Sequence, residues 1–213
     1  MPRRFTPFVT NEFYHVFNRS AYRQPILSNK RDISYFHQLV HYYIQANPPV
    51  KFSYYRTNPD KYDFDLKEKL VSIVSYCYMP NHFHFCLRQE KENGIQKFFQ
   101  KILNSFSHYY ALKYKNKGPL FESAFKAVHI ETEEQLIHLS RYHHLNPVTS
   151  HLVKHPKDYL HSSYNAYFDK YTSVVDPTPI LTHFSSLKAY EKFVLDQIGY
   201  QRKLHQIKHL LLD

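Results

Sequence analysis

Residues 76–87, with the sequence YCYMPNHFHFCL, constrain the fold more than any other stretch. The apolar first half predicts a β-strand, the Met-Pro-Asn segment predicts a turn, and a second strand then begins at His82. Side chains alternate between the two faces of a strand, so His82 and His84 share one face. Phe83 and Phe85 point to the opposite face, toward a core. The sequence therefore predicts two imidazoles on a strand anchored from behind, where they could hold a divalent metal.

The His-x-His spacing is weak support on its own, because 16 histidines in 213 residues give about one such pair by chance. A metal held by two histidines also needs a third protein ligand and open positions for substrate. Asn146 is a candidate, because it lies one helical turn from Tyr142 at the end of a predicted helix. If that helix face meets the histidines, Asn146 could complete the site, with Tyr142 beside it.

A tyrosine oxygen beside a metal-bound phosphodiester is a nucleophile. The ordinary pKa of tyrosine is near 10, so Tyr142 would need a metal that polarises the scissile phosphate at neutral pH. Spacing alone does not single out Tyr142 among 20 tyrosines, and Tyr109, Tyr110 and Tyr164 remain alternatives. A helical tyrosine is more commonly a core residue with its hydroxyl at the surface.

The charge favours a nucleic-acid partner. The chain has 28 Lys and Arg against 18 Asp and Glu, a net charge of +10, and 20 Tyr with 17 Phe. A basic surface attracts polyanions, and aromatic rings among basic residues suit stacking on unpaired bases. A genome rich in A and T would give a similar bias, so this explanation stays open. The candidate DNA-binding residues are Arg19, Lys97, Lys101, Lys113, Lys115, Lys117, Lys126 and Arg141.

The length suits one domain with elaborations and a sizeable core. Cys77 and Cys86 lie in the apolar central strands, which is typical of reduced core thiols in a cytoplasmic protein. The sequence contains no apolar run near the ~20 residues of a membrane span, and its N-terminus lacks the apolar core of a signal peptide. We therefore expect no membrane partner. The oligomeric state cannot be read from the sequence, and we expect either a monomer or a homodimer.

The predicted elements follow the order β-α-β-β-α-β-α. The strands are expected at 13–19, 70–79, 82–88 and 121–131, and the helices at 32–45, 95–115 and 132–146, the last ending before Pro147. This order favours the α+β class, with a ferredoxin-like or RRM-like antiparallel sheet and helices mainly on one face. Residues 1–150 are expected to form the catalytic domain, with an insertion loop or hairpin at 51–69. Residues 151–213 are expected to form a C-terminal extension on this core, with helices at 185–198 and 202–212.

Several motifs in the same order resemble the single-tyrosine HUH transposases, most closely the branch of REP-associated tyrosine transposases. The matching segments are YCYMPNHFHF at 76–85, YHHLNPV at 142–148, YHVFNR at 14–19, FESAFK at 121–126, HP at 155–156 and SSY at 162–164. The resemblance covers roughly residues 10–170, which is far more specific than one motif.

The resemblance implies a divalent metal, Mg²⁺ or Mn²⁺, on His82 and His84, with Asn146 at the position of the polar third ligand. It implies that Tyr142 is the nucleophile and forms a 5′-phosphotyrosine bond with single-stranded DNA while a 3′-hydroxyl is released. The implied substrate is a DNA hairpin with a short recognition sequence beside it, and the implied location is the bacterial cytoplasm, on nucleoid DNA. The chain departs from the family pattern at Ser20, Ser150 and His161, where Gly, Gly and Trp are common.

Other functions remain open. A domesticated module could bind DNA hairpins without cutting them, although the chain keeps all four candidate catalytic and metal-binding residues. An HUH replication or relaxase nuclease often has a third metal-binding histidine and a larger chain, and an RNA-binding ferredoxin-like domain would not need the histidine pair. The pairs His37/His41 and His205/His209 are expected at helix surfaces.

Overall fold

The computed structural model describes residues 7–62, 66–169 and 174–199. At its centre is a four-stranded antiparallel sheet with the strand order β2-β3-β1-β4. The strands are β1 (Phe13–Arg19), β2 (Val71–Met79), β3 (His82–Gln89) and β4 (Lys126–Ile130). The helices are α1 (Lys30–Tyr43), α2 (Phe52–Thr57), α3 (Gly94–Tyr114), α4 (Glu133–Thr149), α5 (Thr178–Leu181) and α6 (Leu187–Leu195).

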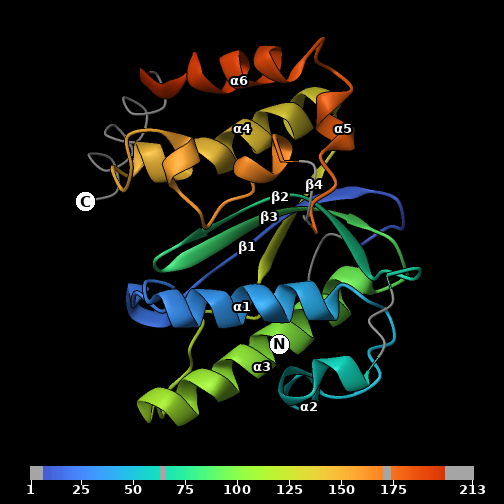
Figure 1. Ribbon diagram of the computed structural model, residues 1–213, viewed down its shortest axis with the longest axis vertical. Helices are drawn as coiled ribbons and strands as arrows, with labels where there is room; N and C mark the ends of the chain where they lie inside the picture. The colour runs from blue at the N-terminus through green and yellow to red at the C-terminus, as the bar shows by residue number, and fades with distance from the viewer. Residues whose placement is uncertain (1–6, 63–65, 170–173, 200–213) are drawn as a thin grey trace.

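The helices form a layer on each face of the sheet. The first three helices lie below the sheet in Figure 1, whereas α4 crosses the upper face with α5 and α6 beyond it. The α+β class and the ferredoxin-like order of the first elements are confirmed. The segment 51–69 contains the short helix α2 and a 3₁₀ turn, Pro59–Lys61. The helix expected at 202–212, with His205 and His209, lies outside the described residues.

The prediction that α4 ends before Pro147 was wrong, because the helix continues to Thr149. Proline lacks the N–H that would bond to the carbonyl of the preceding turn. Leu145 and Val148 are fully buried on either side of it, so the packing of this last turn outweighs one missing hydrogen bond. Ser150 then ends the helix by donating its N–H to the Asn146 carbonyl at 3.0 Å.

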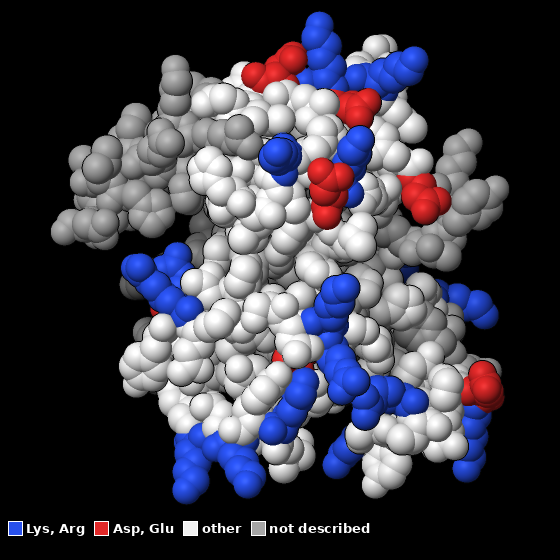
Figure 2. Space-filling model, turned by 60° about the vertical axis from the view of Figure 1, so that its left-hand side comes forward, with Lys and Arg blue, Asp and Glu red and all other residues white. Residues whose placement is uncertain are grey.

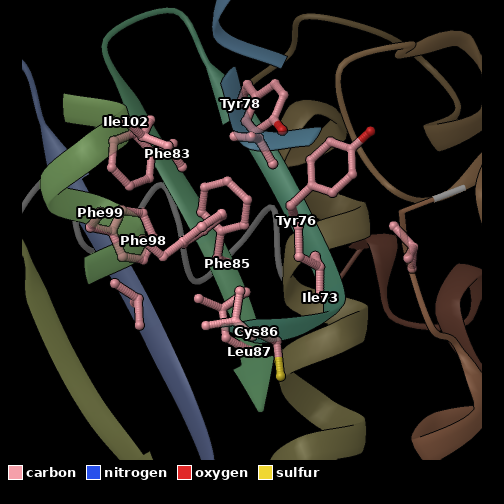
Figure 3. Close-up of a cluster of buried hydrophobic side chains, with 14 of the residues drawn as sticks. Ile73, Tyr76, Tyr78, Phe83, Phe85, Cys86, Leu87, Phe98, Phe99 and Ile102 are labelled. Carbon is pink, nitrogen blue, oxygen red and sulfur yellow. The ribbon is translucent and has the colours of Figure 1, made fainter. Parts of the chain in front are cut away.

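The main core lies between the sheet and the lower helices. Phe83 and Phe85 of β3 are fully buried and point toward α3 (Figure 3). The Phe99 ring on α3 stacks on Phe83 with centroids 5.7 Å apart and meets Phe85 edge-on at 5.5 Å. Each such buried ring stabilises the fold by roughly 1.5–3 kcal/mol. Because Phe83 and Phe85 face α3, the opposite face of β3, which carries His82 and His84, is turned toward α4.

The segment after residue 150 pairs with the outer edge of β2. The N–H of Tyr78 donates to the His161 carbonyl at 2.9 Å, and the N–H of Ser163 donates to the Tyr76 carbonyl at 3.0 Å. Further along, the N–H of Asp176 donates to the Ile73 carbonyl at 2.8 Å. These bonds join the C-terminal segment to the sheet, while the boundary at 150 stays a prediction.

A buried histidine joins α4 to this C-terminal segment. His144 is fully buried, and its Nε2 lies 2.8 Å from the Ser163 hydroxyl while its Nδ1 lies 2.7 Å from the Tyr190 hydroxyl. Burial lowers the pKa of His144 to about 3, so the imidazole is neutral in the folded protein at neutral pH.

No helix in the described part of the chain is long and apolar enough to cross a bilayer.

We expect Gly94→Ala to destabilise the fold. A Cβ at Gly94, the first residue of α3, would overlap the backbone carbonyl of Leu70, which cannot rotate aside. Overpacking of this kind costs roughly 1–3 kcal/mol of unfolding free energy. Urea denaturation would measure it, with Gly118→Ala as the control, since nothing lies within 4 Å of the Cβ position at Gly118. Equal stability of both variants would contradict this packing.

Acid should destabilise the protein through His144. Its pKa is about 3 in the folded state and near 6.5 in the unfolded chain, so between these values only the unfolded state gains the proton. The unfolding free energy should therefore fall with pH below 6.5, by up to about 1.4 kcal/mol per pH unit for this group. Urea denaturation at pH 7.5, 5.5 and 4.5 should show a smaller pH dependence for His144→Gln than for a control at the exposed His108, His108→Gln. Equal slopes would contradict a buried neutral imidazole.

Candidate active site

A pocket of about 320 Å³ opens between one end of the sheet and α4. It is lined by His15, Phe17, Asn18, Arg19, His82, Phe83, His84, Glu122, Lys126 and Tyr142. Strands β1 and β3 supply most of this wall, because their register pairs Arg19 with His82 and Phe17 with His84. Residues paired across antiparallel strands place their side chains on the same face. The structure thus brings the predicted histidine pair and Tyr142 to one cavity.

His82 has a defined tautomer. Its ring lies 5.0 Å from the His84 ring, centroid to centroid, and its Nδ1 lies 2.6 Å from the side-chain oxygen of Asn81. A carbonyl oxygen can only accept, so this Nδ1 carries the proton. Burial, with a smaller effect of Arg19, lowers the pKa of His82 to about 4. The ring is therefore neutral at neutral pH, and its Nε2 keeps a lone pair for a ligand.

His84 is more deeply buried, with 7% of its surface exposed. Its Nδ1 lies 3.0 Å from Nε2 of His15, and its own Nε2 is buried without a hydrogen-bond partner. Burial holds the pKa of His84 well below its ordinary value. A buried imidazole nitrogen without a partner is costly, which suits a position that a ligand completes.

Sequence reasoning missed a group of three histidines that includes His84. One ring nitrogen from each of His15, His84 and His143 lies within 4.8 Å of the others, so this buried triad could hold a metal. His143 contacts the Ser75 hydroxyl through Nδ1 at 2.8 Å, and its buried Nε2 has no hydrogen-bond partner. The structure therefore offers two possible ligand sets that share His84. No local signal in the sequence gives the β1–β3 register that brings His15 beside His84.

Tyr142 lies at the mouth of the pocket. Its ring is 5.4 Å from the His84 ring and edge-on to it, and 38% of its surface is exposed. Burial raises the pKa of Tyr142 above its ordinary value, an effect partly opposed by the nearby side chain of Asn146. Tyr142 therefore stays a phenol at neutral pH in the free protein.

Asn146 lies one turn further along α4 and is 6% exposed. Its Nδ2 is buried without a hydrogen-bond partner, and its side chain is near enough to Tyr142 to lower the pKa of that phenol. It is not among the residues that line the pocket. Its assignment as third metal ligand stays a prediction.

The alternative tyrosines lie elsewhere. Tyr109 donates its hydroxyl hydrogen bond to buried Asp32 at 2.7 Å, on the side of the sheet that carries α1 and α3. Tyr110 packs against the Tyr114 ring on the same helix at 4.4 Å. Tyr164 is 2% exposed. Of the four tyrosines considered, Tyr142 lines the pocket.

The candidate DNA-binding residues divide into several groups. Arg19 and Lys126 line the pocket and are exposed. Lys113 instead forms an ion pair with Asp32, and Arg141 lies over the Phe193 ring of α6 at 4.3 Å. Lys101 lies 5.7 Å from the centroid of the Tyr43 ring. The remaining three candidates are Lys97, Lys115 and Lys117, and all three are exposed.

The face that contains the left-hand end of the sheet is basic in its lower half. Figure 2 turns that end toward the viewer, and blue side chains there greatly outnumber red ones below the level of the sheet. In the upper half, near α4 and α6, blue and red groups are mixed. A surface of one sign beside a pocket attracts a polyanion.

Comparison with known proteins gives a fold relationship. No protein-family model and no curated protein matches the chain. Among solved structures, it is similar to a REP-associated tyrosine transposase bound to a REP hairpin, with a TM-score of 0.56 and 15% identity over 83% of this chain and 94% of that one. A candidate transposase from Deinococcus radiodurans R1 matches with a TM-score of 0.36 and 12% identity over 66% of this chain and 95% of that one, which is too low to support an argument. The chain therefore shares its fold with a REP-associated tyrosine transposase, in agreement with the family resemblance of its motifs.

Proposed function

We propose that this protein is a metal-dependent transposase that cleaves and rejoins single-stranded DNA at hairpin elements. The observation that carries this proposal is the position of the Tyr142 ring, 5.4 Å from His84 in a pocket that also contains His82. A solved structure with the same fold is a tyrosine transposase bound to a hairpin, which supports the same class of substrate here.

His82, His84 and Asn146 would hold the divalent metal. Both imidazoles are neutral, Nε2 of His82 is unprotonated, and Nε2 of His84 is buried without a partner, so the donor atoms fit a cation. The contact of His84 Nδ1 with His15 can hold that ring in the tautomer with a free Nε2. A bound Mg²⁺ or Mn²⁺ would polarise the scissile phosphate and stabilise the charge on its oxygens.

Tyr142 would then attack the phosphorus atom with its phenolic oxygen. A tyrosine–phosphorus bond forms, the bond from phosphorus to the 3′-oxygen of the preceding nucleotide breaks, and that oxygen leaves as a 3′-hydroxyl with the proton that the phenol gives up. The product is a 5′-phosphotyrosine. Attack by a 3′-hydroxyl on this linkage reverses the step, so strands can be rejoined without an external energy source.

The strand would lie along the basic side of the pocket. Arg19 and Lys126 are exposed at the pocket wall, where they can contact phosphates close to the scissile bond. Lys97, Lys115 and Lys117 would bind phosphates further from it. Lys113 and Arg141 already have protein partners, so their contribution to DNA binding would be smaller.

We expect Tyr142→Phe to abolish cleavage, by at least about a thousandfold, because it removes the attacking oxygen. DNA hairpins with single-stranded flanks from around the gene, incubated with Mn²⁺, should give a covalent adduct on a denaturing protein gel with wild type only. Tyr110→Phe removes a hydroxyl from α3 and should leave the adduct unchanged. Hairpin binding by Tyr142→Phe should stay close to wild type. Binding by wild type without any adduct would instead support a non-cleaving hairpin-binding module.

We expect His82→Ala to lower Mn²⁺-stimulated cleavage about a hundredfold or more, because it removes a metal ligand. Isothermal titration with Mn²⁺ should show weaker binding by this variant, and His108→Ala, at an exposed position on α3, should behave as wild type. His143→Leu separates the two ligand sets, since His143 belongs to the triad alone. Cleavage that survives His82→Ala but is lost in His143→Leu would place the metal on the triad.

A further inference from the structure

The loop between β1 and α1 presents an aromatic ring to solvent. Tyr22, in the 3₁₀ turn Ala21–Arg23, is 85% exposed. Tyr22 and Arg23 both adopt left-handed backbone conformations, with φ of 56° and 54°. This conformation is unfavourable for residues with bulky side chains, and an exposed ring gains no burial in return. A strained backbone that holds an apolar ring in water points to a ligand that covers the ring.

Hydrogen bonds fix this loop on the turn that precedes the histidine pair. The N–H of Ser20 donates to the Asn81 carbonyl at 2.8 Å, and the N–H of Leu27 donates to the Pro80 carbonyl at 2.8 Å. Within the loop, the Ser20 hydroxyl donates to the Gln24 carbonyl at 2.6 Å. The position of Tyr22 is thus set by the same turn that sets the start of β3.

The loop also connects directly to the candidate active site. The side-chain amide of Asn81 lies 3.5 Å from the Arg23 carbonyl, and its oxygen accepts from His82 Nδ1 at 2.6 Å. Arg19, three residues before Tyr22, pairs with His82 across the strands and lines the pocket. Tyr22 therefore lies on the loop that follows the pocket-lining Arg19, beside the turn that precedes the histidine pair, and Arg19 and Arg23 on either side of it in the sequence are exposed.

We propose that Tyr22 stacks on an unpaired base of the DNA strand that enters the pocket, while Arg19 and Arg23 contact phosphates beside that base. The proposal rests on the function proposed above and specifies how its substrate is chosen. A planar phenol ring stacks on any base with a free face, and bases inside a duplex have both faces covered. This contact would therefore select the single-stranded flank of a hairpin over its paired stem.

The test compares two hairpins, one with a 5′ single-stranded flank that contains 2-aminopurine and one without a flank. We expect Tyr22→Ala to weaken binding of the flanked hairpin roughly 5- to 150-fold, the range for loss of one base stack. Quenching of 2-aminopurine by wild type should be lost in this variant and restored in Tyr22→Trp. Tyr54→Ala, which removes a tyrosine that is 62% exposed on α2, should bind as wild type.

Three results would overturn the proposal. These are unchanged binding of the flanked hairpin by Tyr22→Ala, an equal loss of binding for the hairpin without a flank, or an equal loss with Tyr54→Ala. The same samples, incubated with Mn²⁺ and analysed on a denaturing gel, test the proposed function separately. Absence of a covalent adduct with wild type would refute strand transfer. The binding of the flanked hairpin by wild type and by Tyr22→Ala would still show whether Tyr22 stacks on a base. Absence of any binding by wild type would refute both.

Discussion

The alternation of side chains along β3 is the constraint on which the rest of the structure depends. Phe83 and Phe85 are held by the aromatic core against α3, so His82 and His84 must face the other way. A slip of one residue in the β3 register would exchange the two sets and bury the imidazoles in an apolar layer. The packing that stabilises the sheet therefore also orients the imidazoles of His82 and His84 toward the candidate site.

The site also depends on a second layer, because the strands alone do not bring Tyr142 beside the histidines. Helix α4 supplies Tyr142, and it is fixed from behind by the bonds of His144 to Ser163 and Tyr190. Both hydroxyls belong to the segment after residue 150. The C-terminal part of the chain therefore takes part in positioning Tyr142, even though none of its described residues lines the pocket.

Features that depend on local sequence could be predicted well. The period of two in β3 was sufficient to place His82 and His84 on one face, whereas spacing alone could not establish that the helix with Tyr142 and Asn146 meets that face. The register of β1 against β3 depends on contacts between residues about 70 positions apart, so the approach of His15 to His84 could not be predicted. The same is true of Arg141, whose charge favoured a DNA contact but whose guanidinium lies over the Phe193 ring. At Pro147, a local rule failed because tertiary packing outweighed it.

The pairing of the C-terminal segment with β2 has a consequence for aggregation of the protein through its edge strands. A strand at the border of a sheet exposes backbone N–H and carbonyl groups that can bind a strand of another molecule. Here the bonds of His161, Ser163 and Asp176 occupy part of that border on β2. On the opposite border, β4 is only five residues long and begins with an exposed lysine, Lys126, and both short length and charge discourage pairing. The C-terminal segment therefore protects this border from pairing with another molecule. Its loss would expose the backbone groups of β2 to aggregation and would also remove the contacts that hold α4 through His144.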